Sequence, residues 1–191
     1  MKVTIYEGTF TSLCKKVLDK EITFAFVISG SLHDEKDYFL QKLYEKNRNY
    51  QKLIFKKIKS YRQSVEVNLN SPLAELNTVS VNGIKKYKQI SRIALPQNSD
   101  NFNEAGINDV LEKNEGAFYT ASYELYNLLI TFNNAVGITI GESKKEAVND
   151  SIVRIPVRDG WTFHFGYVYL EEEKINDSEK EILNYIIDKL S

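Results

Sequence analysis

The stretch from Gly116 to Gly141 constrains the fold more than any other part of this sequence, because it is almost free of charge. Its only charged residue is Glu124, whereas 27% of the 191 residues are charged. At helical spacing its residues form two adjacent, mostly apolar rows: Phe118, Ser122, Leu125, Leu129, Phe132 and Val136, and Tyr119, Tyr123, Tyr126 and Ile130. A helix that is apolar nearly all round is covered by other elements. We therefore expect a buried central helix, followed by a short buried strand at 136–140.

Several other stretches have the pattern of strands or of a capped helix. Residues 21–29 are a run of β-branched and aromatic residues, which indicates a central strand covered on both faces. Alternation predicts strands at 2–6, 64–69, 151–157 and 161–170, and Asn82-Gly83 predicts a hairpin between 77–81 and 84–94. Ser178 and Glu181 fit a capping box at the start of a C-terminal helix.

These patterns together predict an α+β fold. We expect a mixed, mostly antiparallel sheet of about six to seven strands. It packs against a long basic helix, a central aromatic-rich helix and a C-terminal helix. The chain, residues 1–191, is expected to form a single globular domain, and the loop 95–103 is the candidate sub-domain boundary.

The long basic helix is expected at residues 34–61. Its outer face, with the strand predicted at 85–92, carries the basic residues that we predict to bind a partner: Lys42, Lys46, Arg48, Lys52, Lys56, Lys59, Arg62, Lys86 and Lys88. Such a face is compatible with three interpretations. It is a solvated surface, a nucleic-acid-binding surface that follows a phosphate backbone, or a surface that meets an acidic protein.

The charge of the chain is unevenly divided, although its net value is −1. Residues 1–100 hold 17 basic and 10 acidic residues, and residues 101–191 hold 8 basic and 16 acidic residues. This division predicts electrostatic steering toward a charged macromolecular partner. It also allows a homo-oligomer in which the two halves attract each other.

Composition limits the compartment. The single cysteine, Cys14, excludes an intramolecular disulfide and a multi-cysteine metal site, and it is expected to be a small core residue. The N-terminus shows no signal-peptide pattern, and polar residues interrupt the Gly116–Gly141 stretch, so we expect a cytoplasmic protein with no membrane span. Only five of the 25 basic residues are arginines, a bias that indicates a bacterial or phage origin.

Catalytic motifs are scarce. His33 and His164 are the candidate catalytic residues, and neither has metal-ligand spacing, so we expect no metal and no cofactor. His33 follows the strand at 21–29, at the carboxyl end where α/β active sites gather. The turn Ser29-Gly30-Ser31 before a predicted helix has phosphate-binding geometry, but Asp34 would repel a phosphate and with Ser31 resembles a capping box. The region 29–33 is the candidate pocket.

Five aromatic residues alternate along one face of the strand predicted at 161–170: Trp161, Phe163, Phe165, Tyr167 and Tyr169. Such a ladder stacks unpaired bases in some nucleic-acid-binding sheets. An uninterrupted row without a charge is more typical of a packed core. We therefore favour the core interpretation over base stacking.

Three classes of function stay open, and no motif in the sequence is specific enough to assign a family. The first is a non-catalytic cytosolic interaction protein, such as a toxin-neutralising immunity protein or a phage-encoded inhibitor, and it leads by elimination. The second is a nucleic-acid-binding module that uses the basic helix 42–62 and the strand 85–92. The third is an enzyme or small-ligand binder with a pocket near 29–33, although the missing motifs favour a protein that is not an enzyme.

Overall fold

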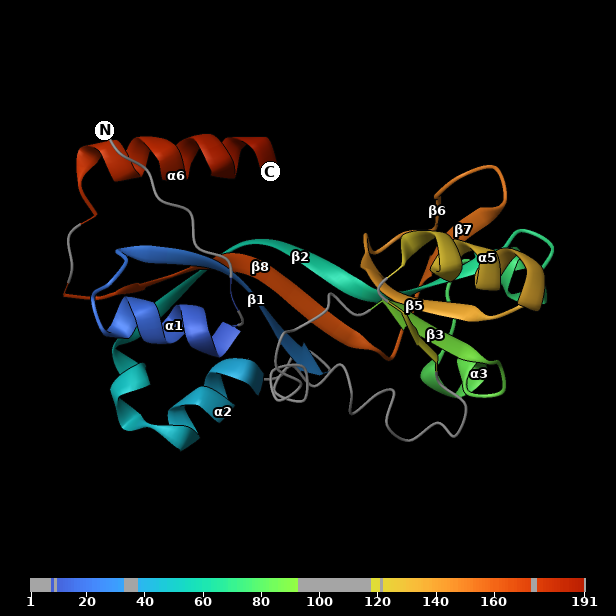
Figure 1. Ribbon diagram of the computed structural model, residues 1–191, viewed down its shortest axis with the longest axis horizontal. Coiled ribbons are helices and arrows are strands. Elements are labelled where there is room, and N and C mark those ends of the chain that lie inside the picture. Colours follow the sequence, from blue (N-terminus) through green and yellow to red (C-terminus); the bar gives the residue numbers. More distant parts are fainter. Residues whose placement is uncertain are drawn as a thin grey trace. The chain divides into compact units, whose positions relative to one another are not determined.

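A computed structural model gives the structure of this protein and describes residues 8, 10–32, 38–92, 118–120, 122–172 and 175–190 (Figure 1). The elements follow in the order α1 Phe10–Leu18, β1 Phe24–Leu32, α2 Tyr38–Lys46, the 3-10 helix η1 Arg48–Lys52, β2 Leu53–Asn68, the 3-10 helix η2 Pro72–Glu75, α3 Val81–Ile84, β3 Gln89–Arg92, β4 Phe118–Thr120, α5 Tyr123–Asn133, β5 Val136–Gly141, β6 Glu146–Ala147, β7 Ile152–Pro156, β8 Trp161–Leu170 and α6 Asp177–Leu190. Of these helices, none is long and apolar enough to cross a membrane.

The strands pair into a mixed sheet with the order β1-β8-β2-β5-β3-β4, and β7 pairs with both β2 and β6. β2 is antiparallel to β5 and β7, whereas β3 is parallel to β4 and β5. The predicted α+β class is therefore confirmed.

The chain forms two compact units, one of residues 1–30, 36–60 and 164–191 and the other of residues 31–35 and 61–163. The predicted boundary at 95–103 lies outside the described residues, and the single-domain prediction stays a prediction.

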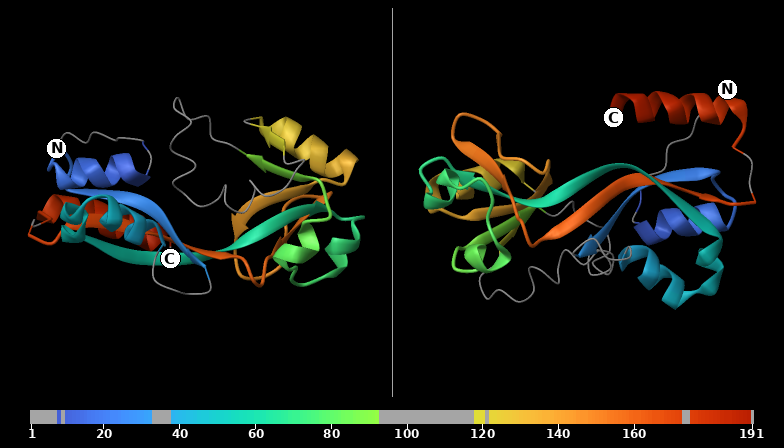
Figure 2. Two further views of the ribbon diagram at one scale, coloured as in Figure 1. Left: turned by 90° about the horizontal axis from the view of Figure 1, so that it is seen from below. Right: turned by 180° about the vertical axis from the view of Figure 1, so that it is seen from behind.

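In the first unit, helices cover a sheet made of β1, β2 and β8. α1 and α2 lie on one side of it and α6 on the other (Figures 1 and 2). The core on the α1 side consists of Cys14, Val17, Ala25, Val27, Leu43, Tyr50, Leu53, Val168 and Leu170. The rings of β1 and β8 meet in reverse order, Phe24 with Tyr167 at 6.5 Å and Phe26 with Phe165 at 5.8 Å between centroids. β1 and β8 are therefore antiparallel, and these rings occupy the face opposite Ala25 and Val27.

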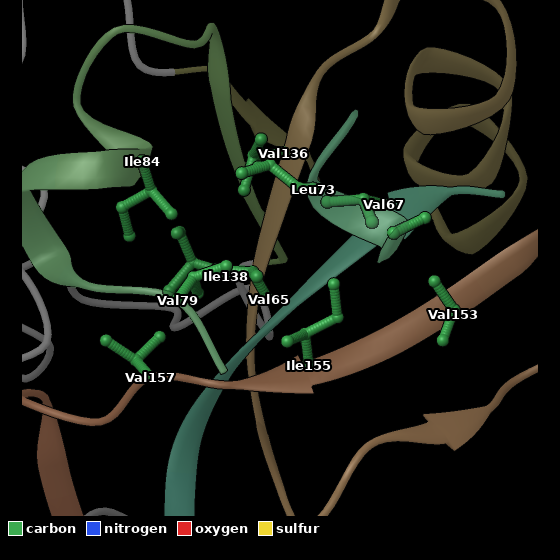
Figure 3. Packing of buried hydrophobic residues seen from close by; sticks show 11 residues of the cluster. Val65, Val67, Leu73, Val79, Ile84, Val136, Ile138, Val153, Ile155 and Val157 are labelled. Atoms are coloured by element: carbon green, nitrogen blue, oxygen red, sulfur yellow. The ribbon is translucent and has the colours of Figure 1, made fainter. Parts of the chain in front are cut away.

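In the second unit, β2 lies between β5 and β7. Val65, in the part of β2 that pairs with both strands, is opposite Ile138 of β5 and opposite Ile155 of β7, and all three side chains are buried. Figure 3 shows the core around them, which comprises Val65, Val67, Leu73, Ala74, Val79, Ile84, Val136, Ile138, Val153, Ile155 and Val157. These residues are mostly β-branched, as expected for strands covered on both faces.

α5 connects β4 to β5, and both of these strands pair with β3. Ser122 caps its N-terminus, because the Ser122 hydroxyl accepts a hydrogen bond from the Leu125 N–H at 3.2 Å. Asn134 ends the helix in the left-handed conformation with φ 49°. Tyr126 and Ile130 pack into a core with Ile90 of β3. The central helix is therefore real but shorter than expected, since Phe118 belongs to β4, and the strand expected at 136–140 is confirmed as β5.

The predicted long basic helix at 34–61 is wrong. Within the described residues α2 ends at Lys46, and the Asn47 carboxamide oxygen then accepts from the Asn49 N–H at 2.9 Å, which caps η1. From Leu53 onward the chain is the strand β2. The apolar residues in 53–61 fit both the period of a helix and the period of a strand. Pairing with neighbouring strands selects the extended form.

The hairpin predicted at Asn82-Gly83 is also wrong. These residues lie inside α3, where the Ser80 hydroxyl accepts from the Gly83 N–H at 3.0 Å and the Asp159 carboxylate accepts from the Val81 N–H at 2.8 Å. Two side-chain caps thus convert a turn sequence into a short helix. The strand expected at 84–94 shrinks to β3, and Lys86 and Lys88 precede it.

Two smaller predictions need correction. β1 overlaps the strand predicted at 21–29 only over residues 24–29, and it stands at one end of the sheet order and is not central. The C-terminal helix exists, but its capping box lies two residues earlier than expected. Asn176 and Glu179 exchange hydrogen bonds between side chain and backbone at 3.0 and 2.9 Å.

A cluster of ions joins three strands of the second unit. The Arg154 guanidinium of β7 donates two hydrogen bonds to Glu66 of β2, at 2.6 and 3.0 Å, and one to Glu146 of β6 at 2.5 Å. Burial lowers the pKa of Arg154, but hydrogen bonds and charge from Glu66 and Glu146 outweigh it and raise the pKa above its ordinary value. Arg154 therefore stays charged and neutralises Glu66, which is only 5% exposed.

We expect Arg154→Leu to lower the free energy of unfolding by about 3 kcal/mol, the lower end for a broken buried pair because Arg154 is partly exposed. Glu66 would then be buried without a counter-charge. The double variant Glu66→Leu/Arg154→Leu should recover most of the loss. Urea denaturation followed by circular dichroism measures both, and Lys180→Leu, which breaks the exposed pair with Asp177, is the control with no expected effect. A double variant as unstable as the single one would contradict the argument.

Gly166 of β8 provides a test of close strand packing in the first unit. A Cβ at this position would collide with the Lys56 carbonyl oxygen and lie 2.7 Å from the Phe55 ring. We expect Gly166→Ala to lower the free energy of unfolding by about 1–3 kcal/mol. Gly83→Ala is the matched control, because a Cβ there meets only the Ser80 hydroxyl, at 3.1 Å. Equal losses in a urea titration of the two variants would show that the contact at Gly166 is unimportant.

Candidate ligand-binding site

Ser31, near the C-terminal end of β1, carries a buried hydroxyl that the fold does not use. The residue is 1% exposed, and its Oγ has no hydrogen-bond partner. Burying a hydroxyl without a partner is unfavourable, so buried hydroxyls in proteins are normally paired. The unpaired hydroxyl makes Ser31 a candidate for a hydrogen bond to a bound molecule. It lies within the region 29–33 that the sequence indicates as a candidate pocket.

Thr162, the second residue of β8, has the same property. It is 6% exposed and its Oγ1 has no hydrogen-bond partner. Ser31 and Thr162 belong to the same compact unit, and their strands β1 and β8 are neighbours in the sheet. The backbone next to Thr162 is fixed, because the Gln63 side-chain oxygen accepts from the Trp161 N–H at 3.0 Å. Thr162 is not among the predicted site residues, since a threonine in an aromatic strand has the pattern of an ordinary sheet residue.

These hydroxyls can donate and accept hydrogen bonds. Among the residues that the structure describes, no group of three or more histidine, cysteine or acidic side chains is close enough to bind a metal ion. The chemistry that the pair offers is recognition of a polar group on an organic molecule. His33 and Asp34, which the sequence places beside this region, lie outside the described residues.

His164, the second catalytic candidate, lies in the first unit. Its Nδ1 is 2.9 Å from the Ser60 hydroxyl of β2. A serine next to a histidine is the beginning of a nucleophilic site, but acyl transfer also needs free backbone N–H groups around the reacting oxygen. Ser60 and His164 lie within neighbouring strands, whose backbone groups bond to each other. The contact between Ser60 and His164 is therefore an ordinary cross-strand pair. A catalytic role of His164 stays a prediction.

The basic residues predicted to bind a partner do not share one helix face. Lys46, Arg48 and Lys52 belong to α2 and η1, whereas Lys56 and Lys59 lie on opposite faces of β2, because strand side chains alternate. Arg62, Lys86 and Lys88 belong to the other compact unit. The side chain of Lys42 lies outside the described residues. A role of these basic residues in binding a partner stays a prediction. The single basic helix face that the sequence predicted for them is not formed.

The aromatic ladder at 161–169 belongs mainly to the core. Trp161, Phe163 and Tyr167 are at most 8% exposed, and Phe165 and Tyr169 are half-buried. Lys56 covers the ring of Tyr169, with its Nζ 5.5 Å from the ring centroid. The three buried rings have no free face on which a base could stack. The core interpretation is therefore correct.

Cys14 is also a core residue, as expected. It is fully buried in the first unit, and burial raises the pKa of its thiol to about 12. A thiol with such a pKa is protonated at neutral pH, and the thiolate is the nucleophilic form. Cys14 is therefore a poor nucleophile in the folded protein.

Known proteins resemble this chain in structure but not in sequence. No protein-family model matches it, and no curated protein matches its sequence. It is similar to HinK, a LysR family transcriptional regulator from Pseudomonas aeruginosa, with 10% identity and a TM-score of 0.59 over 97% of this chain and 59% of HinK. Full-length BenM gives 12% identity and a TM-score of 0.62 over 97% of this chain and 56% of BenM. The effector-binding domain of QuiR in complex with shikimate gives 12% and 0.56 over 97% and 80%.

These similarities establish the fold and overturn one prediction. The chain spans little more than half the length of HinK and BenM, but most of the length of the QuiR domain. The leading prediction, a toxin-neutralising immunity protein or phage-encoded inhibitor that binds a protein partner, is wrong. It rested on the absence of catalytic motifs, a feature that ligand-binding domains share. This chain has the fold of the effector-binding domains of LysR family transcriptional regulators.

Proposed function

We propose that this chain is a small-ligand-binding domain, and that it senses an effector for a transcriptional regulator. The observation that carries the proposal is the similarity of 97% of the chain to the QuiR effector-binding domain, whose structure contains shikimate. The proposal agrees with the third class that the sequence left open, a small-ligand binder near 29–33. A regulator of this kind acts in the cytoplasm, which agrees with the expected location.

Ser31 and Thr162 are the residues that we propose to contact the ligand. The antiparallel ring contacts between β1 and β8, continued along both strands, bring residue 31 opposite residue 160. Ser31 and Thr162 then lie on the same face of the sheet as diagonal neighbours, about 7–8 Å apart. A ligand with two polar atoms, or one carboxylate, can reach hydroxyls at this separation. Binding would provide the hydrogen bonds that both hydroxyls lack.

Nucleic-acid binding is part of the proposal only for the regulator as a whole. HinK is a transcriptional regulator, and this chain spans 59% of its length. We do not propose that Lys42–Arg62 reads DNA as a helix, because α2 ends at Lys46 and the segment from Leu53 onward is the strand β2. Fluorescence anisotropy with duplex DNA at low and physiological salt tests whether the basic residues bind phosphates without the ligand.

Two substitutions test the ligand site. Ser31→Ala and Thr162→Val remove hydroxyls that make no hydrogen bond in the folded protein, so the free energy of unfolding should stay unchanged or rise slightly. Ligand affinity should fall about fivefold to tenfold for each variant, the value of one hydrogen bond. The measurement is a thermal-shift screen of small carboxylic acids and polyols that begins with shikimate, followed by calorimetric titration of each compound that stabilises the protein.

Ser60→Ala is the matched control, since this serine is exposed and bonded to His164. It should leave ligand affinity unchanged. The site assignment would be wrong if Ser31→Ala and Thr162→Val destabilised the unliganded protein by about 1 kcal/mol or more, because the hydroxyls would then have partners within the fold. It would also be wrong if both variants bound a confirmed ligand as tightly as the original chain.

A further inference from the structure

Gln63 of β2 carries a buried carboxamide of which the fold uses only one end. The residue is 3% exposed, and its Oε1 accepts a hydrogen bond from the Trp161 N–H at 3.0 Å. This bond fixes which way the carboxamide is turned, because its oxygen only accepts and its nitrogen only donates. Among the residues that the structure describes, no acceptor bonds to the amide Nε2. Gln63 therefore holds an unused donor on a side chain that is almost fully buried.

Asn68, further along the same strand, is a carboxamide of which the fold uses both ends. It is 8% exposed, its Oδ1 accepts from the Asn70 N–H at 2.8 Å, and its Nδ2 donates to the Thr131 carbonyl oxygen at 2.9 Å. Asn68 and Gln63 belong to the same compact unit. Because buried donors are normally paired, the free Nε2 of Gln63 has the same standing as the unpaired hydroxyls of the ligand site.

Gln63 lies next to the residues that we assign to the ligand. A Cβ added at Gly160, the residue before β8, would be 2.6 Å from the Gln63 Oε1 and 3.1 Å from the Gln63 Cβ, so the Gln63 side chain lies against Gly160. On the other side of β8, the register of the ring contacts places Ser31 opposite residue 160. Thr162 follows on the same face of β8. A glycine, which has no side chain, thus separates the Gln63 carboxamide from Ser31, and all four residues belong to the second unit.

We propose that the amide of Gln63 determines the specificity of the ligand site, and that it requires an oxygen acceptor on the ligand. This inference rests on the proposed function, because it adds Gln63 to the site of Ser31 and Thr162. Hydroxyls donate or accept, so the two of them do not distinguish a carboxylate from an alcohol or an ammonium group. The amide can only donate, and turning it over would break the bond to Trp161. A carboxylate or carbonyl oxygen fits this corner of the site, whereas an ammonium group would place a donor against a donor.

Gln63→Glu tests the proposal, because the new carboxylate still accepts from the Trp161 N–H but offers no donor at neutral pH. The probes for calorimetric titration are shikimate and three compounds with one ring and different head groups: cyclohexanecarboxylate, cyclohexylmethanol and cyclohexylmethylammonium. The unaltered chain should bind cyclohexanecarboxylate at least about tenfold more tightly than the ammonium compound. Gln63→Glu should reverse this order and weaken both carboxylates about tenfold to hundredfold, the value of a hydrogen bond to a charged group.

Asn68→Asp is the matched control, since it makes the same change from amide to acid on the same strand. It should keep the order of the probes. Its melting temperature should fall further than that of Gln63→Glu, because both variants bury a carboxylate but only Asn68→Asp loses a hydrogen bond, the one to Thr131. An equal or larger fall for Gln63→Glu would show that its amide has a partner within the fold, and would overturn the proposal without any ligand.

The titrations separate this inference from the proposed function. If Ser31→Ala weakens the binding of a probe but Gln63→Glu weakens neither carboxylate, the ligand site stands and the role of Gln63 is overturned. An unaltered chain that binds the ammonium compound as tightly as cyclohexanecarboxylate also overturns that role. If no probe, and no acid or polyol of the thermal-shift screen, binds in a way that Ser31→Ala weakens, the proposed function fails and this inference fails with it.

Discussion

Backbone pairing along β2 is the constraint on which the rest of the structure depends. Its 16 residues pair with β8, β5 and β7, and the strand contributes to both compact units. Within the second unit, Val65 has a partner on each side, Ile138 and Ile155, so this part of the strand has no free edge. An interior strand satisfies its hydrogen bonds only if its neighbours hold their register. The ion cluster around Glu66 of β2 reinforces that register with side-chain bonds across three strands.

The hydroxyls of Ser31 and Thr162 have no hydrogen-bond partner, in contrast to the paired polar groups of β2. Within the same unit, the Glu66 carboxylate of β2 accepts a hydrogen bond from Arg154 of β7, and the Gln63 side-chain oxygen accepts one from the Trp161 N–H of β8. These polar atoms therefore contribute to the fold. Ser31 and Thr162 are as deeply buried but bond to nothing. A fold tolerates such groups where another molecule completes them. The side-chain oxygens of Gln89 in β3 and Asn127 in α5 are buried without a partner as well. Ser31 and Thr162 are assigned to ligand binding because they also lie on neighbouring strands, β1 and β8, at the region 29–33.

Several local features could be read from the sequence because they depend on neighbouring residues alone. The strand at 136–140 and the C-terminal helix follow from apolar runs and periodicity, and the fold class follows from their alternation. The pocket region 29–33 contains Ser31, but the sequence suggested a capping or phosphate-binding serine and not an unpaired one. Thr162 could not be found, because only the absence of a partner distinguishes it, and partners come from distant parts of the chain.

The sequence by itself determined which segments are apolar, that a helix ends the described chain and that the protein is of the α+β class. Only the tertiary structure decided that residues 53–61 form a strand, since their apolar residues fit both the helical and the strand period and the neighbouring strand β8 is about a hundred residues away in sequence. It also decided that Asn82-Gly83 joins a helix, because the carboxylate that bonds to Val81 comes from Asp159. The exposure of Leu125, Leu128 and Phe132 has the same origin: composition makes α5 apolar all round, but one sheet can cover only one of its faces.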